Sequence, residues 1–161
     1  DPIELQANDR VMAVAVVPAN GPMWVGTRAG SIEIFDLHSG QHLTSVTGAH
    51  QGRIYSLIRA GTLMWSSGDD GVSIIDTEGF FLAAKFEIGI VTELQELSGG
   101  LVGIAPAASN TNIHLWGGDG SHQGSSAVQG TWNSVATNGK DLWLGGVGRI
   151  CTFSLPKLGK I

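Results

Sequence analysis

Two histidines four residues apart, His38 and His42, are the first residues whose spacing could support chemistry. Two imidazoles at this spacing can hold one metal ion when both lie on a helix. Here they flank Ser39-Gly40, which is typical of a turn. We therefore interpret both as solvated turn histidines.

Three aspartates, Asp69, Asp70 and Asp119, could offer oxygen ligands to calcium. The sequence has no Asp-x-Asp-x-Asp-Gly loop followed by Glu, and aspartate is a common turn residue. The Gly-x-Gly-x-x-Cys stretch from Gly146 to Cys151 lacks the third glycine of a dinucleotide-binding loop. We therefore predict no metal and no cofactor.

No arrangement typical of a hydrolase occurs. Gly-x-Ser-x-Gly is absent, and order alone assigns no Ser, His and Asp to a catalytic triad. The glutamates do not recur at one position of the repeat described below, as carboxylates gathered in the channel of a propeller enzyme would. We predict that the chain is not an enzyme, and a propeller enzyme fragment ranks third among the functions considered.

The composition is that of a folded protein, because 42% of the 161 residues are apolar and 14% are charged. Nine basic and fourteen acidic residues give a net charge of −5 without a run of Lys or Arg, so no nucleic-acid partner is expected. No apolar run approaches the length of a membrane span. The single cysteine, Cys151, and the lack of an Asn-x-Ser/Thr acceptor favour a cytoplasmic location.

The stretch from Arg53 to Asp76 is the most complete copy of a unit that recurs along the chain. Its three apolar runs are rich in β-branched and aromatic residues and are separated by Ala60-Gly61-Thr62 and Gly68-Asp69-Asp70-Gly71. Short runs of this kind are typical of β-strands, and Asp-Gly favours a tight hairpin. The unit predicts a three-strand antiparallel meander.

The same pattern begins again at intervals of about 40 residues, with Trp24, Val102 and Trp143 in the place of Trp65. A further apolar segment follows each of the first three copies and predicts a fourth strand. These segments lie at 41–46, 80–86 and 125–128. A tandem four-strand unit of about 40 residues is the signature of a β-propeller blade.

We therefore predict an all-β fold, a single β-propeller domain over residues 1–161 with four antiparallel strands per blade. The chain would form four blades or a four-blade portion of a larger ring. The repeats lie at about 10–52, 53–88, 89–130 and 131–161, with a longer second turn at 106–112 in the third and with 1–9 as a closing strand. The stretch 90–97 is rich in Glu and Leu, but its length and its place in the repeat favour strand over helix.

The second copy resembles a WD repeat, whose pattern is Gly-His, a strand, Ser-Gly-x-x-Asp-Gly and then Trp-Asp. Gly48-Ala49-His50 precedes the first strand, Ser67 to Gly71 forms the turn, and Ile75-Asp76 closes the unit. The resemblance covers roughly residues 10–155 and weakens toward the last two copies. It implies a network in which His50 and Asp70 fill two places, although Ile75 replaces the closing Trp. It also implies a signalling scaffold for protein-protein interaction.

A second resemblance concerns Met23 to Thr27 and Asp141 to Gly145. Both are similar to the Leu-Trp-x-Gly-Thr repeats of sensor propellers found outside the membrane in bacterial two-component receptors. This resemblance implies an extracytoplasmic ligand-sensing propeller of a receptor, which is the alternative function. The Gly-His element favours the WD-repeat interpretation.

The aromatic series Trp24, Trp65 and Trp143 follows the period of the repeat. Because each follows an apolar neighbour inside a predicted strand, we expect all three to be buried at equivalent places between blades. Trp132 stands at the entry to a first strand beside Gly130-Thr131. Both a core position and an exposed binding position fit it.

Propeller turns between second and third strands gather on one face with the connections to the next blade, and such loops commonly bind partners. The WD-repeat resemblance implies a non-catalytic scaffold that binds a peptide or protein there. The candidate binding residues are Arg28, His50, Arg53, Asp69, Asn110, His122, Trp132 and Arg149.

The last unit has only residues 156–161 in the place of a fourth strand. An open row of blades would leave sheet faces and strand edges in water. We therefore expect missing blades of a parent protein, or a second copy, to complete the ring. In a homodimer the strand from Ile3 to Ala7 would join the partner's last blade, and two copies would give eight blades.

Overall fold

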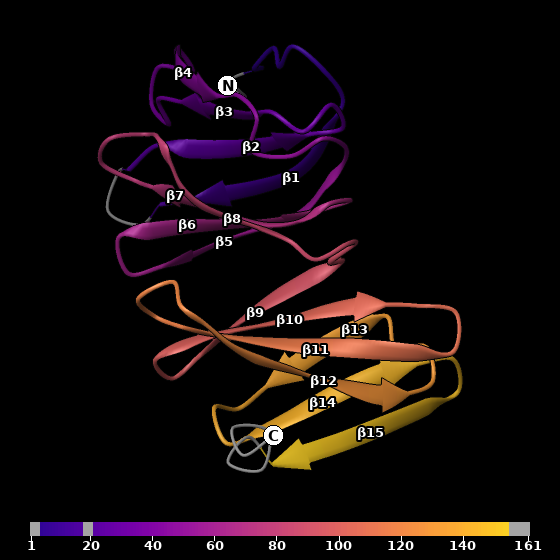
Figure 1. Cartoon of the computed structure of the whole chain (residues 1–161). Coiled ribbons are helices and arrows are strands. Elements are labelled where there is room, and N and C mark those ends of the chain that lie inside the picture. The colour runs from indigo at the N-terminus through magenta and orange to yellow at the C-terminus, as the bar shows by residue number, and fades with distance from the viewer. Residues whose placement is uncertain (1–3, 18–20, 155–161) are drawn as a thin grey trace.

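The chain forms four antiparallel β-sheets in a computed structural model that describes residues 4–17 and 21–154 (Figure 1). Within these residues, the first three sheets have four strands each and the fourth has three. The strands are β1 (Val11–Val16), β2 (Met23–Thr27), β3 (Ile32–Phe35), β4 (His42–Val46), β5 (Ile54–Ala60), β6 (Leu63–Gly68), β7 (Gly71–Asp76), β8 (Leu82–Glu87), β9 (Glu93–Leu97), β10 (Gly100–Pro106), β11 (Asn110–Gly117), β12 (His122–Gln129), β13 (Ser134–Thr137), β14 (Asp141–Gly146) and β15 (Arg149–Ser154).

Each sheet is a simple meander whose strands pair in chain order. The all-β prediction is confirmed, β4, β8 and β12 lie at the predicted fourth strands, and β9 is a strand rather than a helix. Glycine is required in the tight turn between β6 and β7, where Gly71 has a φ of 139° and its backbone lies against the Phe86 carbonyl. No helix occurs in the described residues, and therefore none that could cross a membrane.

The registers make the four sheets equivalent residue by residue. The second strand of each sheet pairs with the third at one matching position. These pairs are Trp24–Ile34, Trp65–Ile74, Val102–Leu115 and Trp143–Thr152. The repeat that the sequence predicts therefore exists as a repeat of strand pairing.

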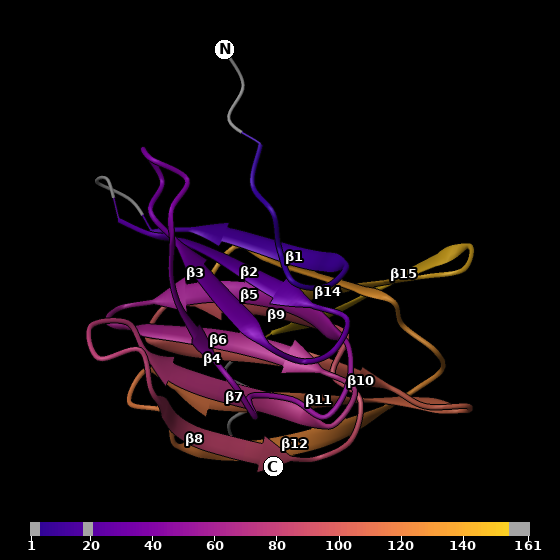
Figure 2. The same ribbon diagram turned by 90° about the horizontal axis from the view of Figure 1, so that it is seen from above.

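The sheets follow one another along an arc. The first strands are its inner members, since β1 contacts β5, β5 contacts β9 and β9 contacts β13. Figure 1 places the first sheet at the top and the fourth at the bottom, and Figure 2 shows β8 and β12 on the same side of the molecule. Within the described residues, no comparable contact joins β13 to β1.

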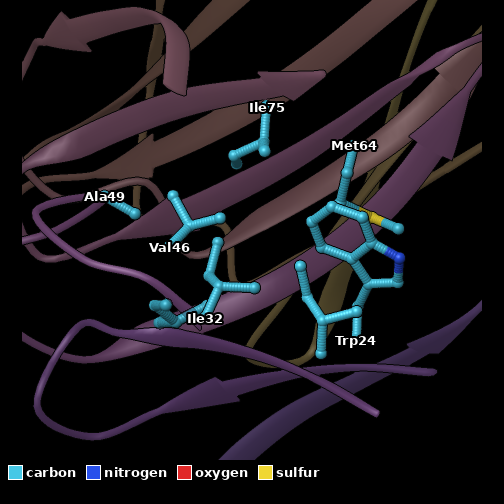
Figure 3. Packing of buried hydrophobic residues seen from close by; sticks show 8 residues of the cluster. Trp24, Ile32, Val46, Ala49, Met64 and Ile75 are labelled. Carbon is cyan, nitrogen blue, oxygen red and sulfur yellow. The ribbon is translucent and has the colours of Figure 1, made fainter. Parts of the chain in front are cut away.

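Three apolar clusters fill the three junctions between neighbouring sheets. In the first, Trp24 and Ile32 of the first sheet pack with Met64 and Ile75 of the second (Figure 3). Strands of alternating side chains supply these contacts, because every second residue points toward the same neighbouring sheet. The core therefore lies between sheets.

Trp143 departs from the prediction that all three tryptophans of the series are buried. Trp24 and Trp65 are 0% exposed, but Trp143 is only partly buried. The reason is its place in the fourth sheet. Its neighbours Leu142 and Leu144 point into the third cluster, so Trp143 points to the opposite, outer face.

Two smaller predictions also need correction. The second turn of the third copy is short, because β10 extends to Pro106 and β11 begins at Asn110. Residues 4–7 form no strand, and the segment instead approaches the first sheet, where the Asn8 N–H donates to the Glu33 carboxylate (3.1 Å). Ile3 and residues 156–161, which stand in the place of the last unit's fourth strand, lie outside the described residues.

Candidate functional site

The turns after each second strand and the segments leading to each next sheet lie together at one end of the arc, here called the loop end. Backbone hydrogen bonds join them between neighbouring loops. The His50 N–H donates to the Gly30 carbonyl (3.1 Å), and the Gly130 N–H donates to the Ser109 carbonyl (2.9 Å). These bonds hold the loops in fixed positions on the sheets.

A hydrogen-bonded series crosses the junction of the first two sheets. His50 is buried, with its Nδ1 2.6 Å from Asp70 Oδ1 and its Nε2 2.9 Å from Ser66 Oγ. When Nδ1–H donates to the carboxylate, Nε2 is left to accept a hydrogen bond from the Ser66 hydroxyl. Asp70 also accepts from the Gln51 N–H (3.0 Å) and from Lys85 Nζ (2.9 Å).

Burial and hydrogen bonding set the charges of this series. Burial lowers the pKa of His50, against the opposing effect of the Asp70 hydrogen bond. Burial alone would raise the pKa of Asp70, but hydrogen bonds from Lys85 and His50 outweigh it and lower the pKa to about 2. A neutral imidazole therefore faces a carboxylate at pH 7. The three side chains are hydrogen-bonded in the order Asp–His–Ser, as in a hydrolase triad. Ser66, however, is 0% exposed, so no substrate reaches its hydroxyl.

Asp69 is also engaged within the protein. Its carboxylate accepts from the Arg53 N–H (2.9 Å) and from the Tyr55 hydroxyl (2.6 Å). The Tyr55 hydrogen bond lowers the pKa of Asp69 and keeps it ionised. Asp69 therefore fixes the loop that carries Arg53. Arg53 is exposed, as is Arg28 on the neighbouring turn.

The second group of predicted residues lies at the junction of the third and fourth sheets. Trp132, for which core and binding positions both fitted, is buried, and its indole N–H donates to the Gln129 carbonyl (3.2 Å). The guanidinium of Arg149 lies 4.7 Å from the centre of the Trp132 ring, within the range of a cation–π contact. Asn110 begins β11 opposite Gln129. Trp132 is thus a core residue covered by an exposed arginine.

His122 lies apart from the other predicted residues. It follows the turn between β11 and β12 at the opposite end of the arc, and its Nε2 is 3.4 Å from Nδ1 of His114. His114 stacks on Trp116 with ring centres 5.7 Å apart, and its Nε2 is buried without a hydrogen-bond partner. Burial, reinforced by His122, lowers the pKa of His114 to about 4.

The exposed arginines gather at the loop end, where the exposed carboxylates Asp9 and Glu87 also lie. Four arginines classed as exposed lie at the loop end, namely Arg10, Arg28, Arg53 and Arg149. The turns of the opposite end hold Lys140 and five carboxylates, namely Asp36, Asp76, Glu78, Asp119 and Asp141. The loop end therefore presents cationic side chains on a chain whose net charge is −5.

One cavity of about 160 Å³ opens between the β9–β10 turn and the end of β11. Its lining includes Leu97, Leu115, Trp116 and Gln123. It lies at the end opposite the arginines. Its volume is well below the roughly 300–1,000 Å³ of typical small-molecule pockets.

The described residues contain no group of three His, Cys, Asp or Glu side chains placed to hold a metal ion. His42 contacts Ser45, with its Nε2 2.9 Å from the hydroxyl, and the backbone of His38 donates to the Asp36 carboxylate (3.1 Å). Both histidines are exposed and lie at the turn, as interpreted.

The structure thus assembles seven of the eight predicted residues at the loop end, in two groups, and leaves out His122. The prediction omitted Arg10, although Arg10 precedes β1 as Arg53 precedes β5, and the period relates the two. It also omitted Ser66, although the WD-repeat resemblance implies a Ser or Thr in the His50–Asp70 network, and it omitted Lys85, for which no local motif exists. Their roles depend on side chains that come together only through pairing of strands.

No protein-family model matches the chain, and no curated protein matches it. Among solved structures, the computationally designed Ika4 protein is similar over 94% of this chain and 95% of its own, with a TM-score of 0.78 and 18% identity. The computationally designed Ika8 protein is similar over 90% of this chain and 46% of its own, with a TM-score of 0.75 and 20% identity. The likeness is one of fold, and this chain spans about half the length of Ika8.

Proposed function

We propose that this chain is a non-catalytic protein-interaction module that binds an acidic peptide or protein segment at its loop end. The observation that carries the proposal is the gathering of Arg10, Arg28, Arg53 and Arg149 at that end. Arginine donates in a planar fork that suits carboxylates, so the chemistry favours a partner rich in Asp and Glu.

The rigidity of the loop end supports the same function. Asp69 and Asp70 are ionised, but Tyr55 and Lys85 neutralise or occupy part of their acceptor capacity. The exposed arginines are thus carried by loops that internal hydrogen bonds already order. Preordered loops lose less conformational entropy when a ligand binds.

The WD-repeat resemblance agrees with this proposal, since the second copy carries the His50–Asp70 pair and Ser66 extends it. The cavity beside the β9–β10 turn does not favour the sensor interpretation, because it is small and lies at the opposite end. Catalysis has less support because the Ser66 hydroxyl is buried.

The proposal is tested by selecting peptides on the immobilised chain from a random display library. The selected peptides should be enriched in Asp and Glu. Fluorescence anisotropy should give a loss of about tenfold or more in affinity, equivalent to about 1.4 kcal/mol, for the double variant Arg28→Glu, Arg53→Glu. The matched control is Lys140→Glu in the β13–β14 turn at the opposite end, which should leave the affinity unchanged. Selection of basic peptides, or equal losses in both variants, would contradict the proposal.

A further inference from the structure

The three junctions between sheets repeat one packing arrangement, and two sheet faces remain outside it. We call the face of a sheet that points toward the following sheet its front face, and the opposite one its back face. The front face of the fourth sheet and the back face of the first sheet have no neighbouring sheet among the described residues.

The front face of the fourth sheet carries side chains suited to a neighbour. At one position, Trp24, Trp65 and Val102 of the first three sheets are each 0% exposed, while the equivalent Trp143 is partly exposed. The other four tryptophans of the chain are all buried. The Trp143 ring thus stands at a position that a neighbouring sheet buries in the other three sheets.

A second position gives a sharper contrast. This position lies on the third strand of each sheet, opposite the second-strand residue that comes two places after the first position. In the first three sheets it holds Ile32, Val72 and Ile113, and all three are 0% exposed. The equivalent residue of the fourth sheet is Ile150, which pairs with Gly145 and is 76% exposed. At these two positions the front face repeats the interior pattern, although Thr152 pairs with Trp143 where the other sheets have Ile34, Ile74 and Leu115.

The back face of the first sheet shows the complementary pattern. Leu94 and Val135, on the first strands of the third and fourth sheets, are buried against the preceding sheet. The equivalent residue of the first sheet is Val14, which pairs with Val25 on β2 and is 53% exposed. Val16, two residues further along the same face, is also exposed.

Only part of this back face is open. The Asn8 N–H reaches the Glu33 carboxylate on β3, and Phe35 on the same face is buried with its ring against the edge of His42. The open part is the inner half along β1 and the start of β2. It carries Val14 and Val16 together with half-buried Met23, and no ionisable side chain.

We propose that the front face of the fourth sheet packs on the back face of the first sheet of a second copy. The first junction provides the template, in which Trp24 and Ile32 pack with Met64 (Figure 3). Half-buried Leu57 packs against the same cluster. In the dimer, Trp143 and Ile150 of one copy take the places of Trp24 and Ile32. Val14 and Met23 of the other copy take the places of Leu57 and Met64. Each copy uses both faces, so two arcs close into one ring of eight sheets.

A second copy fits better than closure of one chain. The fourth sheet lies at the far end of the arc from the first, and in the described part of the chain β13 makes no contact with β1 comparable to those between neighbouring first strands. The match to the Ika8 protein takes up 46% of that chain, so a longer chain can contain this four-sheet shape. The contact is head-to-tail, and head-to-tail contacts that close give rings. The ring would place both arginine-bearing loop ends on the same side.

Sedimentation analysis of the full chain tests the proposal first. The paired ring has twice the 16.8 kDa mass of the chain. Trp143 is the one tryptophan that is not buried, so acrylamide quenching of tryptophan fluorescence measures how far this side chain is exposed to solvent. We expect a dimer at high concentration, and quenching that rises on dilution. A monomer at every soluble concentration, or an open series of larger assemblies, would overturn the proposal.

Paired charge variants identify the faces. Trp143→Arg and Val14→Glu should each give a monomer, because each buries an unpaired charge at both contacts of the ring. A mixture of the two variants should recover the dimer, since one contact is then wild type and the other brings the introduced guanidinium against the introduced carboxylate. Val147→Glu, at an 89% exposed turn residue of the same sheet, is the matched control and should remain dimeric.

Circular dichroism of each variant establishes that it remains folded. Recovery in the mixture requires both variants to be folded, so it separates a lost interface from a lost fold. Two outcomes would overturn the head-to-tail contact. One is a Val14→Glu variant that still forms dimers, and the other is folded variants that fail to recover a dimer when mixed. A symmetric contact between two fourth sheets predicts this second result.

Discussion

The second and fourth sheets share one register but differ in how they are covered. Trp65 and Val72 of the second sheet are 0% exposed, whereas the equivalent Trp143 is partly exposed and Ile150 is 76% exposed. Both sheets have apolar side chains at these two positions, so an apolar residue alone does not ensure burial. Burial at these positions comes from the neighbouring sheet.

The second sheet also differs in its polar groups. Its loop end holds the His50–Asp70 pair, and its other neighbour presents His114, which stacks on Trp116 beside Trp65. The fourth sheet contains no histidine. We therefore expect acid, and substitutions in the core, to lower the free energy of unfolding mainly at the two junctions of the second sheet.

The largest expected effect is that of Trp65→Ala. The ring is wholly buried and meets Trp116 edge-on, with ring centres 6.1 Å apart. Removing a buried large aromatic side chain leaves a cavity and costs about 3 to 5 kcal/mol. Urea denaturation at a concentration where the chain is monomeric measures the loss. A loss below about 1 kcal/mol would break the assignment of Trp65 to the core.

Acid should destabilise the second junction through His114. Its pKa is about 4 in the folded protein, against an ordinary value of 6.5. The unfolded chain therefore binds the proton more readily, so stability is full above pH 6.5 and falls as the pH drops toward 4. At about 1.4 kcal/mol for each pKa unit, and with allowance for solvent screening, the total loss is about 2 to 3 kcal/mol.

Urea denaturation at a series of pH values checks this slope. His114→Gln should reduce the loss by about 2 to 3 kcal/mol. His122→Gln should keep most of it, because burial is the larger cause of the shift and His122 the smaller. An unchanged slope in His114→Gln would show that the acid sensitivity arises elsewhere.

Asp70→Asn should have a smaller effect at the first junction. The substitution weakens the bonds that the carboxylate accepts from His50 and Lys85, at a cost of about 1 to 3 kcal/mol. The pKa of Asp70 is lowered to about 2 from 3.8, so its stabilisation is present above pH 3.8 and lost as the pH falls to 2. That acid branch should disappear in the variant.

Thermal unfolding measures the effect of Asp70→Asn at neutral pH. Glu87→Gln is the matched control, because Glu87 lies 3.7 Å from the same Lys85 but its side chain is 68% exposed. Exposed ion pairs contribute about 1 kcal/mol or less. Equal losses in the two variants would mean that the His50 series does not brace the junction.

The strands and their repeat were predictable because apolar runs and turn residues are local signals. Trp24, Trp65 and Val102 fall in equivalent pairs, as the period of about 40 residues indicates. The burial of each sheet face was not predictable, because it depends on whether a neighbouring sheet is present, and the prediction for Trp143 was wrong for this reason. The burial of His114 was not predicted for a related reason. Its burial depends on Trp116 and His122, which no motif links to it.

Trp143→Ala should have the smallest effect on the free chain. The ring lies on the front face of the fourth sheet, where it is partly in water, so its removal opens no enclosed cavity. A loss of about 1 kcal/mol or less is expected in dilute solution, against about 3 to 5 kcal/mol for Trp65→Ala.

Raising the protein concentration should widen the difference between wild type and Trp143→Ala, because a partner that binds only the folded state stabilises it by mass action. Urea midpoints at two concentrations measure this. If Trp143→Ala costs as much as Trp65→Ala in the dilute monomer, the ring is part of a core within the chain, and the contrast between the second and fourth sheets does not hold.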